Sequence, residues 1–193
     1  TTVAGVGNNS VITRVWTAAD DNGNATTYTQ TITLEDTTVP TFTTSPADIT
    51  VECDASTLPA GTNGPAVATD NCDSDVTITS ADTTVAGVGN NSVITRVWTA
   101  TDDNSNATTY TQTITVVDTT APTFTNSPAS LTVECSASTD TSDTGTATAS
   151  DNCDNNVTVT SADTTVDGIG NNSVITRVWT ATDDNSNATT YTQ

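Results

Sequence analysis

Acidic and amide side chains are concentrated in the stretch "TATDDNSN" (residues 99–106), which places two aspartates and two asparagines within residues 102–106. The stretch recurs as "TAADDNGN" at 17–24 and as "TATDDNSN" at 180–187. Three roles fit these residue types. Their oxygens could bind calcium, the two carboxylates could act in acid–base catalysis, or the stretch could form a hairpin turn, because Asn and Asp make Asx turns and tolerate left-handed backbone.

The catalytic role fits least. Adjacent residues of an extended strand point to opposite faces, so Asp102 and Asp103 would not face one gap, as the carboxylate pair of a glycosidase must. The chain has no histidine and no lysine, so the usual bases that activate a nucleophile are missing. We therefore expect that the protein is not an enzyme.

The sequence leaves open whether this stretch binds calcium. Asp102, Asn104 and Asn106 have the alternate spacing of a metal-binding loop, although the bidentate glutamate of an EF-hand is missing. Asp118 and Asp70 would add carboxylates if the fold brought them together. A hairpin turn at the same residues is the stronger expectation, and it is compatible with a bound cation.

Composition restricts the class of partner. The chain has 23 acidic residues and three arginines, and its formal net charge is -20 over 193 residues. Such a surface cannot neutralise phosphates, so nucleic acid is not expected as a partner. No run approaches the roughly 18 apolar residues of a membrane-spanning helix, so no membrane span is expected in this segment.

Alternating polar and β-branched residues indicate strands. The pattern is clear in "ITVEC" (49–53), "VTITS" (76–80) and "TQTITVVD" (111–118). Val, Ile and Thr favour pleated, half-buried surfaces, and no comparable 3.6-residue stripe competes. The chain is therefore predicted to be all-β.

An internal repeat is the strongest signal. The stretch "TTVAGVGNNSVITRVWTA" begins at Thr1 and Thr83, and it returns as "TTVDGIGNNSVITRVWTA" at Thr164. The tryptophans of the copies recur at intervals of 82 and 81 residues. The chain is a tandem array of one module of about 82 residues.

Two proline-containing linkers, "DTTVPTF" (36–42) and "DTTAPTF" (118–124), mark the module boundaries. The predicted domains are the C-terminal half of one repeat (1–37), a complete repeat (38–118), and a repeat that lacks its last strand (119–193). The simplest interpretation is a segment of a longer array. The alternative is that the incomplete sheet accepts a strand from another chain at its unpaired edge.

Seven short strands are expected in the complete repeat, separated by clusters of Gly, Asn, Asp and Pro. They lie around residues 41–43, 48–53, 66–69, 76–80, 84–85, 92–101 and 108–117. This number of short alternating strands predicts a two-sheet sandwich.

Cysteines supply a staple for a small core. Cys53 with Cys72, and Cys135 with Cys153, give one predicted disulfide per complete module, closing loops of 18 and 17 residues. A disulfide over such a loop stabilises by roughly 3 kcal/mol in the chain-entropy model. A zinc site is disfavoured because the chain has no histidine and no C-x-x-C spacing. Disulfides indicate an oxidising, extracytoplasmic setting.

Each module has a single cation, the arginine of "ITRVW". In a strand Arg96 shares a face with Trp98, so it should point toward the core and pair with a carboxylate. The glutamates of "VEC" recur in phase, which predicts Arg96 with Glu52 and Arg177 with Glu134. An arginine stacked on the surface of its own strand is the alternative.

The order "DTTAPTF…LTVEC…ATASDNC…VTVTS…VITRVWTATDDNSN…YTQTITVVDTTAP" resembles the hyalin-repeat (HYR) and related immunoglobulin-like modules. Its most specific parts are "DNC" (70–72, 151–153), "WTATD" (98–102, 179–183) and the linker. Such modules are strung in tandem in large surface proteins of Bacteroidota, including gliding-motility adhesins. The resemblance covers the whole repeat, and it implies tandem immunoglobulin-like sandwiches and export to the cell surface.

The resemblance also implies candidate O-glycosylation sites in the Asp-Thr-Thr motifs: Thr37, Thr83, Thr119 and Thr164. We expect an extracellular spacer in a long surface fibre, with neighbouring repeats of the same chain as its partners. One alternative is a module whose repeated loops bind glycans or surfaces multivalently. Another is a filament subunit that joins other copies by strand exchange.

Overall fold

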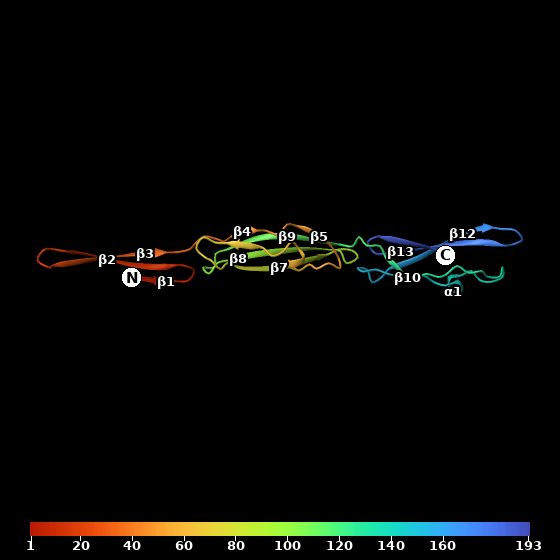
Figure 1. Ribbon diagram of the computed structural model, residues 1–193, viewed down its shortest axis with the longest axis horizontal. Coiled ribbons are helices and arrows are strands. Elements are labelled where there is room, and N and C mark those ends of the chain that lie inside the picture. Colours follow the sequence, from red (N-terminus) through yellow and green to blue (C-terminus); the bar gives the residue numbers. More distant parts are fainter. The chain divides into compact units, whose positions relative to one another are not determined.

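The structure is a computed structural model that describes residues 1–193. The chain forms two compact units, and each combines parts of successive repeats. Unit 1 consists of residues 1–48, 58–83 and 95–113, and unit 2 of residues 49–57, 84–94 and 114–193. Strands dominate throughout, as Figure 1 shows, and the all-β prediction is confirmed.

The first 37 residues form one antiparallel sheet in the order β1-β2-β3. Its strands are β1 (Thr2–Ala4), β2 (Ser10–Ala19) and β3 (Ala25–Leu34). The facing residues Trp16 and Tyr28 of β2 and β3 are exposed, at 55% and 68%. The equivalent tryptophan of the complete second repeat, Trp98, is 3% exposed.

The second repeat has six strands in two sheets. They are β4 (Thr41–Thr44), β5 (Ile49–Glu52), β6 (Val67–Thr69), β7 (Thr77–Ala86), β8 (Ser92–Thr101) and β9 (Ala107–Val117). One sheet pairs β4 with β6, and the other has the order β5-β9-β8-β7. Two of the seven predicted strands are joined in β7, and a 3-10 turn, η1 (Pro59–Gly61), lies between β5 and β6. The two sheets are consistent with the predicted sandwich.

Strand β5 pairs in parallel with the end of β9, in a register that runs from Ile49 opposite Ile114 to Glu52 opposite Val117. This pairing brings Ile49 against the buried cluster of Ile94, Ile114 and Val116. The core of the second repeat therefore depends on the last residues of β9.

The alternating burial of β8 confirms the predicted faces. Ile94, Arg96, Trp98 and Ala100 are buried, whereas Val97 on the opposite face is exposed. The two-residue period of the strand thus places an arginine between two apolar side chains of the core.

The third repeat has the strands β10 (Thr123–Asn126), β11 (Thr148–Ser150), β12 (Thr158–Asp167), β13 (Ser173–Thr182) and β14 (Ala188–Thr192), and one short helix, α1 (Thr141–Thr144). Its larger sheet has the order β12-β13-β14, and β10 pairs with β11. Residues 131–134, which correspond to β5, form no strand. In the second repeat the equivalent residues pair with the β9 segment 114–117.

No helix in the structure is long and apolar enough to cross a membrane.

Candidate functional site at the junctions between repeats

Two turns and a linker aspartate meet wherever one repeat follows another. We call the turns the GNN turn and the DNSN turn, and their meeting place a junction. The first junction, within unit 1, consists of Gly7–Asn9, Asp36 and 102–106. The second, within unit 2, consists of Gly89–Asn91, Asp118 and 183–187.

The DNSN turn is a hairpin turn folded around its first aspartate. Asp102 is buried, and its Oδ1 accepts hydrogen bonds from the backbone N–H groups of Asn104 and Asn106, at 2.9 and 2.8 Å. Its Oδ2 accepts a third from Asn106 Nδ2, at 2.8 Å. Ser105 adopts the left-handed conformation that closes the turn, with φ of 70°. The hairpin-turn prediction is therefore confirmed, and the carboxylate of Asp102 is occupied within its own turn.

Asn91 ties the second junction together. Its Oδ1 accepts the backbone N–H of Asp118 at 2.7 Å, and its Nδ2 donates to Asn185 Oδ1 in the next repeat at 3.0 Å. Asn185 Nδ2 donates to the Gly89 carbonyl at 3.0 Å, and Asn187 Nδ2 donates to the Asp118 carbonyl at 3.2 Å. The amides of the third repeat thus complete the turn and the linker of the second.

The first junction has the same network. Asn9 accepts the backbone N–H of Asp36 and donates to Asn104 Oδ1, at 2.7 and 3.0 Å. Asn104 Nδ2 donates to the Gly7 carbonyl and Asn106 Nδ2 to the Asp36 carbonyl, both at 3.2 Å. Because the contacts recur with the repeat, they belong to the array and not to one copy.

A glycine permits the close approach of the two turns. Gly89 has a φ of +57°, and a Cβ at this position would lie 2.7 Å from Asn185 Nδ2. Gly7 has a φ of +58°, and a Cβ there would lie 2.8 Å from the Asn104 amide. Gly170, in the third GNN turn, has a φ of +68° and no such neighbour within 4 Å.

A disulfide crosses the second junction. Cys53 of the second repeat is bonded to Cys153 of the third, with a Cα–Cα distance of 5.9 Å, while Cys72 and Cys135 are free thiols. The predicted pairs Cys53–Cys72 and Cys135–Cys153 are therefore wrong. Cys53 directly follows β5, whose partner segment of β9 leads into the linker to the third repeat, so Cys53 reaches the next module.

Cys72 lies at the first junction, where Cys153 lies at the second. The Asn8 side chain donates to the Cys72 carbonyl, as the Asn90 side chain donates to the Cys153 carbonyl. Burial and the charges of Asp36 and Asp70 raise the pKa of the Cys72 thiol. This thiol is therefore protonated at neutral pH and a weak nucleophile.

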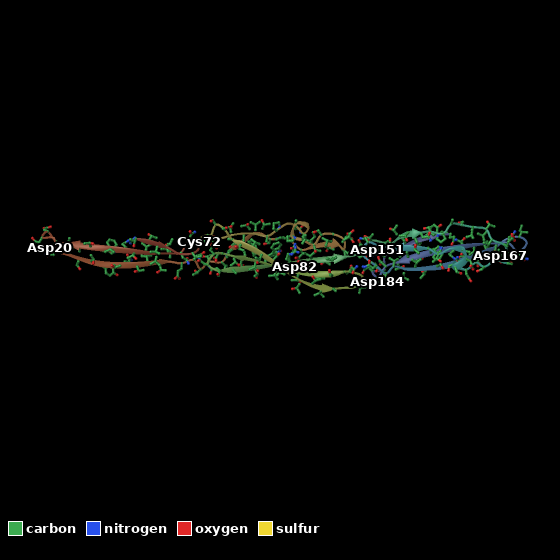
Figure 2. The ribbon with its side chains drawn as sticks, turned by 90° about the horizontal axis from the view of Figure 1, so that it is seen from below. Asp20, Cys72, Asp82, Asp151, Asp167 and Asp184 are labelled. Carbon is green, nitrogen blue, oxygen red and sulfur yellow. A yellow bond between two sulfur atoms is a disulfide. The ribbon has the colours of Figure 1, made fainter.

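Two acidic clusters accompany the junction cysteines. In the first, carboxylate oxygens of Asp36 and Asp70 and the Cys72 sulfur lie within 4.8 Å of one another. In the second, Asp118, Asp151 and the Cys153 sulfur do so. Asp151 and Cys72 are labelled in Figure 2.

The predicted calcium set does not assemble as one site. Asp70 lies beside Asp36, and Asp118 lies beside Asp151. The three DNSN side chains of the set, Asp102, Asn104 and Asn106, are occupied by hydrogen bonds within the turn and across the junction. The carboxylates pair across repeat boundaries, which a view of one isolated module could not predict.

The buried arginine pairs with an aspartate of the neighbouring strand. Arg96 Nε and Nη2 donate to the two carboxylate oxygens of Asp82, both at 2.8 Å, and Nη1 donates to Thr62 Oγ1 at 2.9 Å. Glu52 instead accepts the backbone N–H and hydroxyl of Thr119, at 3.2 and 2.5 Å. The predicted Arg96–Glu52 pair is wrong, because the partner lies on the adjacent strand β7.

The same correction holds in the third repeat. Arg177 Nε and Nη2 donate to the carboxylate of Asp163, both at 2.7 Å, and Asp163 is its direct cross-strand neighbour. Glu134 is exposed. The predicted Arg177–Glu134 pair is therefore wrong as well.

The four threonines predicted as O-glycosylation candidates, Thr37, Thr83, Thr119 and Thr164, are exposed. Their modification stays a prediction.

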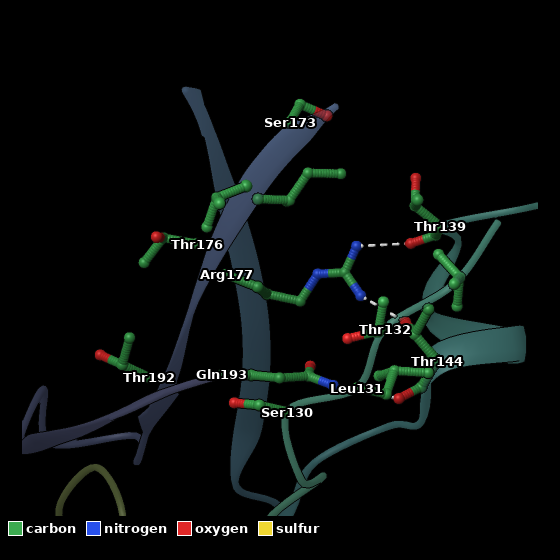
Figure 3. A pocket seen from close by; sticks show the side chains of 13 residues that line it. Ser130, Leu131, Thr132, Thr139, Thr144, Ser173, Thr176, Arg177, Thr192 and Gln193 are labelled. Atoms are coloured by element: carbon green, nitrogen blue, oxygen red, sulfur yellow. Dashed lines mark hydrogen bonds between the residues drawn. The ribbon is translucent and has the colours of Figure 1, made fainter. Parts of the chain in front are cut away.

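A groove of about 590 Å³ opens in the third repeat (Figure 3). Its lining includes Leu131 and Val133 on one side and Ile175 and Arg177 of β13 on the other. Arg177 donates hydrogen bonds to the Thr144 hydroxyl and the Thr139 carbonyl, both at 2.7 Å. These donors of its guanidinium are therefore satisfied by groups that line the groove. The second repeat places the end of β9, with Ile114 and Val116, between the corresponding residues Ile49, Val51 and Ile94.

The complete module matches a known family of domains. Residues 41–116 match the family described as "HYR-like domain with 4 cysteines". Over this segment the chain is similar to an HYR-like domain. The segment begins at the first strand of the second repeat and ends within β9, so it coincides with the complete module. HYR-like domains are extracellular repeat modules. No curated protein matches the chain.

The HYR-like segment contains two cysteines, Cys53 and Cys72, and the structure assigns them to different junctions. Sequence reasoning missed Asn91, Asp82 and Asp151 as functional residues. A signal was nevertheless present, since all three recur in phase, as Asn9, Asp163 and Asp70 respectively.

Proposed function

We propose that the chain is a spacer segment of an extracellular fibre, in which consecutive HYR-like repeats are locked end to end. The observation that carries this proposal is the Cys53–Cys153 bond, which joins two successive repeats covalently. A module that only displayed a binding surface would not need such a link to its neighbour.

The junction contacts support the same role. Asn91 and Asn185 connect side chain to side chain at 3.0 Å, and the equivalent Asn9–Asn104 contact has the same length. The asparagines that contact the next repeat recur in every copy of the GNN turn. This pattern fits a stalk, in which each unit must pass load to the following one.

Force spectroscopy tests the proposal. When the oxidised chain is pulled from its ends, the 100-residue separation between Cys53 and Cys153 should be shielded from extension. The contour length should then be shorter by roughly 330–360 Å than after reduction. Cys72→Ser, which removes a cysteine outside the bond, is the matched control and should leave the trace unchanged. Full extension of the oxidised chain would remove the support for a locked spacer.

The rival role is adhesion, in which the repeated loops bind glycans or surfaces with avidity. Glycan-array and surface-binding measurements on the same chain separate the two roles. A spacer should give no specific signal, whereas binding that is lost on substitution of exposed loop residues would favour an adhesin.

A second candidate role is the acceptance of a strand from another copy in the groove beside β13. Its apolar wall contains Leu131, Val133 and Ile175, and the second repeat fills the corresponding position with a β-strand. Strand exchange would make the chain self-associate with rising concentration. Sedimentation velocity tests this, because a monomer at all concentrations would exclude a filament built in this way.

A further inference from the structure

The junction clusters concentrate negative charge where no cation of the protein reaches. Asp36 and Asp118 are 7% and 5% exposed, and each lies within 4.8 Å of a second carboxylate. The two ion pairs of the structure involve other aspartates, Asp82 and Asp163. Two carboxylates that face each other in a partly dehydrated site repel one another, so such a pair calls for a compensating positive charge.

Three carboxylate oxygens in these clusters are buried and have no hydrogen-bond partner. They are Oδ2 of Asp36, Asp70 and Asp151. Asp36 is the clearest case, because more than nine-tenths of the residue is buried. Buried polar atoms are rarely left unsatisfied, and an unpaired carboxylate oxygen beside a second carboxylate is typical of a ligand atom.

Backbone groups fix the orientation of these carboxylates. Asp36 Oδ1 accepts the N–H of Thr38 at 3.0 Å, so its other oxygen turns toward the cluster. Asp70 Oδ1 accepts the N–H groups of Cys72 and Asp73, at 2.8 and 3.1 Å, and Asp151 Oδ1 accepts those of Cys153 and Asp154 at the same distances. Each aspartate therefore offers a preoriented free oxygen.

We propose that each junction binds one calcium ion between the linker aspartate of one repeat and the DNC aspartate of the next. The paired ligands are Asp36 with Asp70 and Asp118 with Asp151. At the second junction Asp118 Oδ2 also accepts Asn185 Nδ2, at 3.2 Å, so the DNSN turn holds the ligand in place. A calcium ion takes about six to eight oxygen ligands, so water and backbone carbonyls would complete the shell.

The chemistry of the donors selects a hard cation. The sulfur at the first cluster is a thiol, but the sulfur at the second belongs to a disulfide. What the two clusters share is the carboxylate pair, and the chain has no histidine that would favour zinc. The site joins the linker of one repeat to the loop of the next, so calcium would stabilise the junction without depending on the spacer role.

Isothermal titration of the oxidised 193-residue chain with calcium chloride tests the proposal. We expect two sites, with dissociation constants of about 10⁻⁴ to 10⁻³ M, as in extracellular modules. Asp36→Asn with Asp70→Asn should leave one site, and so should Asp118→Asn with Asp151→Asn. Asp143→Asn with Asp167→Asn removes the same charge from exposed residues outside the junctions, and this control should retain both sites.

A second readout does not depend on the variants. The melting temperature of the unaltered chain should be higher in millimolar calcium than in EDTA, and magnesium should have a smaller effect. An unchanged melting temperature together with no heat of binding would overturn the proposal. So would calcium binding that both double variants retain, or binding of zinc alone that is abolished when the Cys72 thiol is blocked.

Discussion

Cys53 and Cys153 are bonded across the boundary between two repeats, and their Cα atoms lie 5.9 Å apart. Cys53 and Cys72 belong to the same repeat but lie at different junctions, because Cys72 lies at the preceding junction beside Asp36. Cys135 stands in the third repeat where Cys53 stands in the second. The unit that the disulfide stabilises is therefore the junction.

Arginine-specific digestion distinguishes the two pairing schemes. The chain has arginines only at positions 14, 96 and 177, so cleavage separates fragment 15–96, with Cys53 and Cys72, from fragment 97–177, with Cys135 and Cys153. After denaturation with blocked thiols and no reductant, we expect the two fragments to remain covalently joined. Mass spectrometry that finds them separate, each with an internal disulfide, would contradict the bond across the junction.

Loss of this disulfide should destabilise the chain strongly. A bond that closes a separation of 100 residues stabilises by about 4.7 kcal/mol in the chain-entropy model. We expect Cys153→Ser to lower the free energy of unfolding of unit 2 by about 2–5 kcal/mol, as is usual when a native disulfide is removed. Urea unfolding measures the change. Cys135→Ser is the control, because this exposed thiol is free, and it should change the stability little.

Two glycines with the same backbone conformation isolate the contact between repeats. Alanine at Gly170 should cost about 1–2 kcal/mol, because its φ is +68° and left-handed backbone is strained for alanine. Alanine at Gly89 carries the same strain, and its Cβ would also lie 2.7 Å from Asn185 Nδ2. Urea unfolding should therefore show a larger loss for Gly89→Ala. Equal losses for the two variants would show that the turns do not pack against each other in solution.

The Arg96–Asp82 pair makes stability depend on pH. The hydrogen bonds from Arg96 hold the pKa of the Asp82 carboxyl below its ordinary value. Its contribution is therefore fully present above the unfolded-state pKa, about 3.9, and is lost as the pH falls through the lower folded-state pKa. Asp82→Asn should reduce the stability at pH 7 by about 1 kcal/mol, since the Asp82 side chain is 39% exposed and water screens the pair. The same substitution should have a smaller effect at pH 2.

Thermal melts across this pH range check the expectation. Asp75→Asn serves as the control, since Asp75 is exposed and has no ion pair. A pH dependence that Asp82→Asn leaves unchanged would assign the acid sensitivity to other carboxylates.

The local features of the fold could be predicted from the sequence. The hairpin turn at Asp102 and the buried face of β8 follow from Asx-turn chemistry and the two-residue period of strands. The partners of Cys53, Arg96 and Asp118 could not be predicted in this way. The partner of Arg96 depends on which strands are neighbours, and the partners of Cys53 and Asp118 depend on which repeat supplies them. The sequence of one module contains other cysteines and carboxylates that fit these roles equally well.

The groove of the third repeat gives the last prediction. In the second repeat the sequence "TITVVD" (113–118) contains the end of β9, where Ile114 and Val116 form a core with Ile49 and Ile94. We expect that adding these six residues after Gln193 fills the groove, and that residues 131–134 then form a strand. Burial of two large aliphatic side chains stabilises by about 3–6 kcal/mol in total, so the melting temperature of the third repeat should rise markedly.

A charged version of the extension is the matched control. "TDTDVD" keeps the length of the addition but places aspartates at the positions that correspond to Ile114 and Val116, so it should not fill the apolar groove. Hydrogen exchange at residues 131–134 gives a local readout, because pairing with the added strand should protect these amides. If "TITVVD" protects them no better than the charged version, the groove does not accept a strand, and the strand-exchange role fails with it.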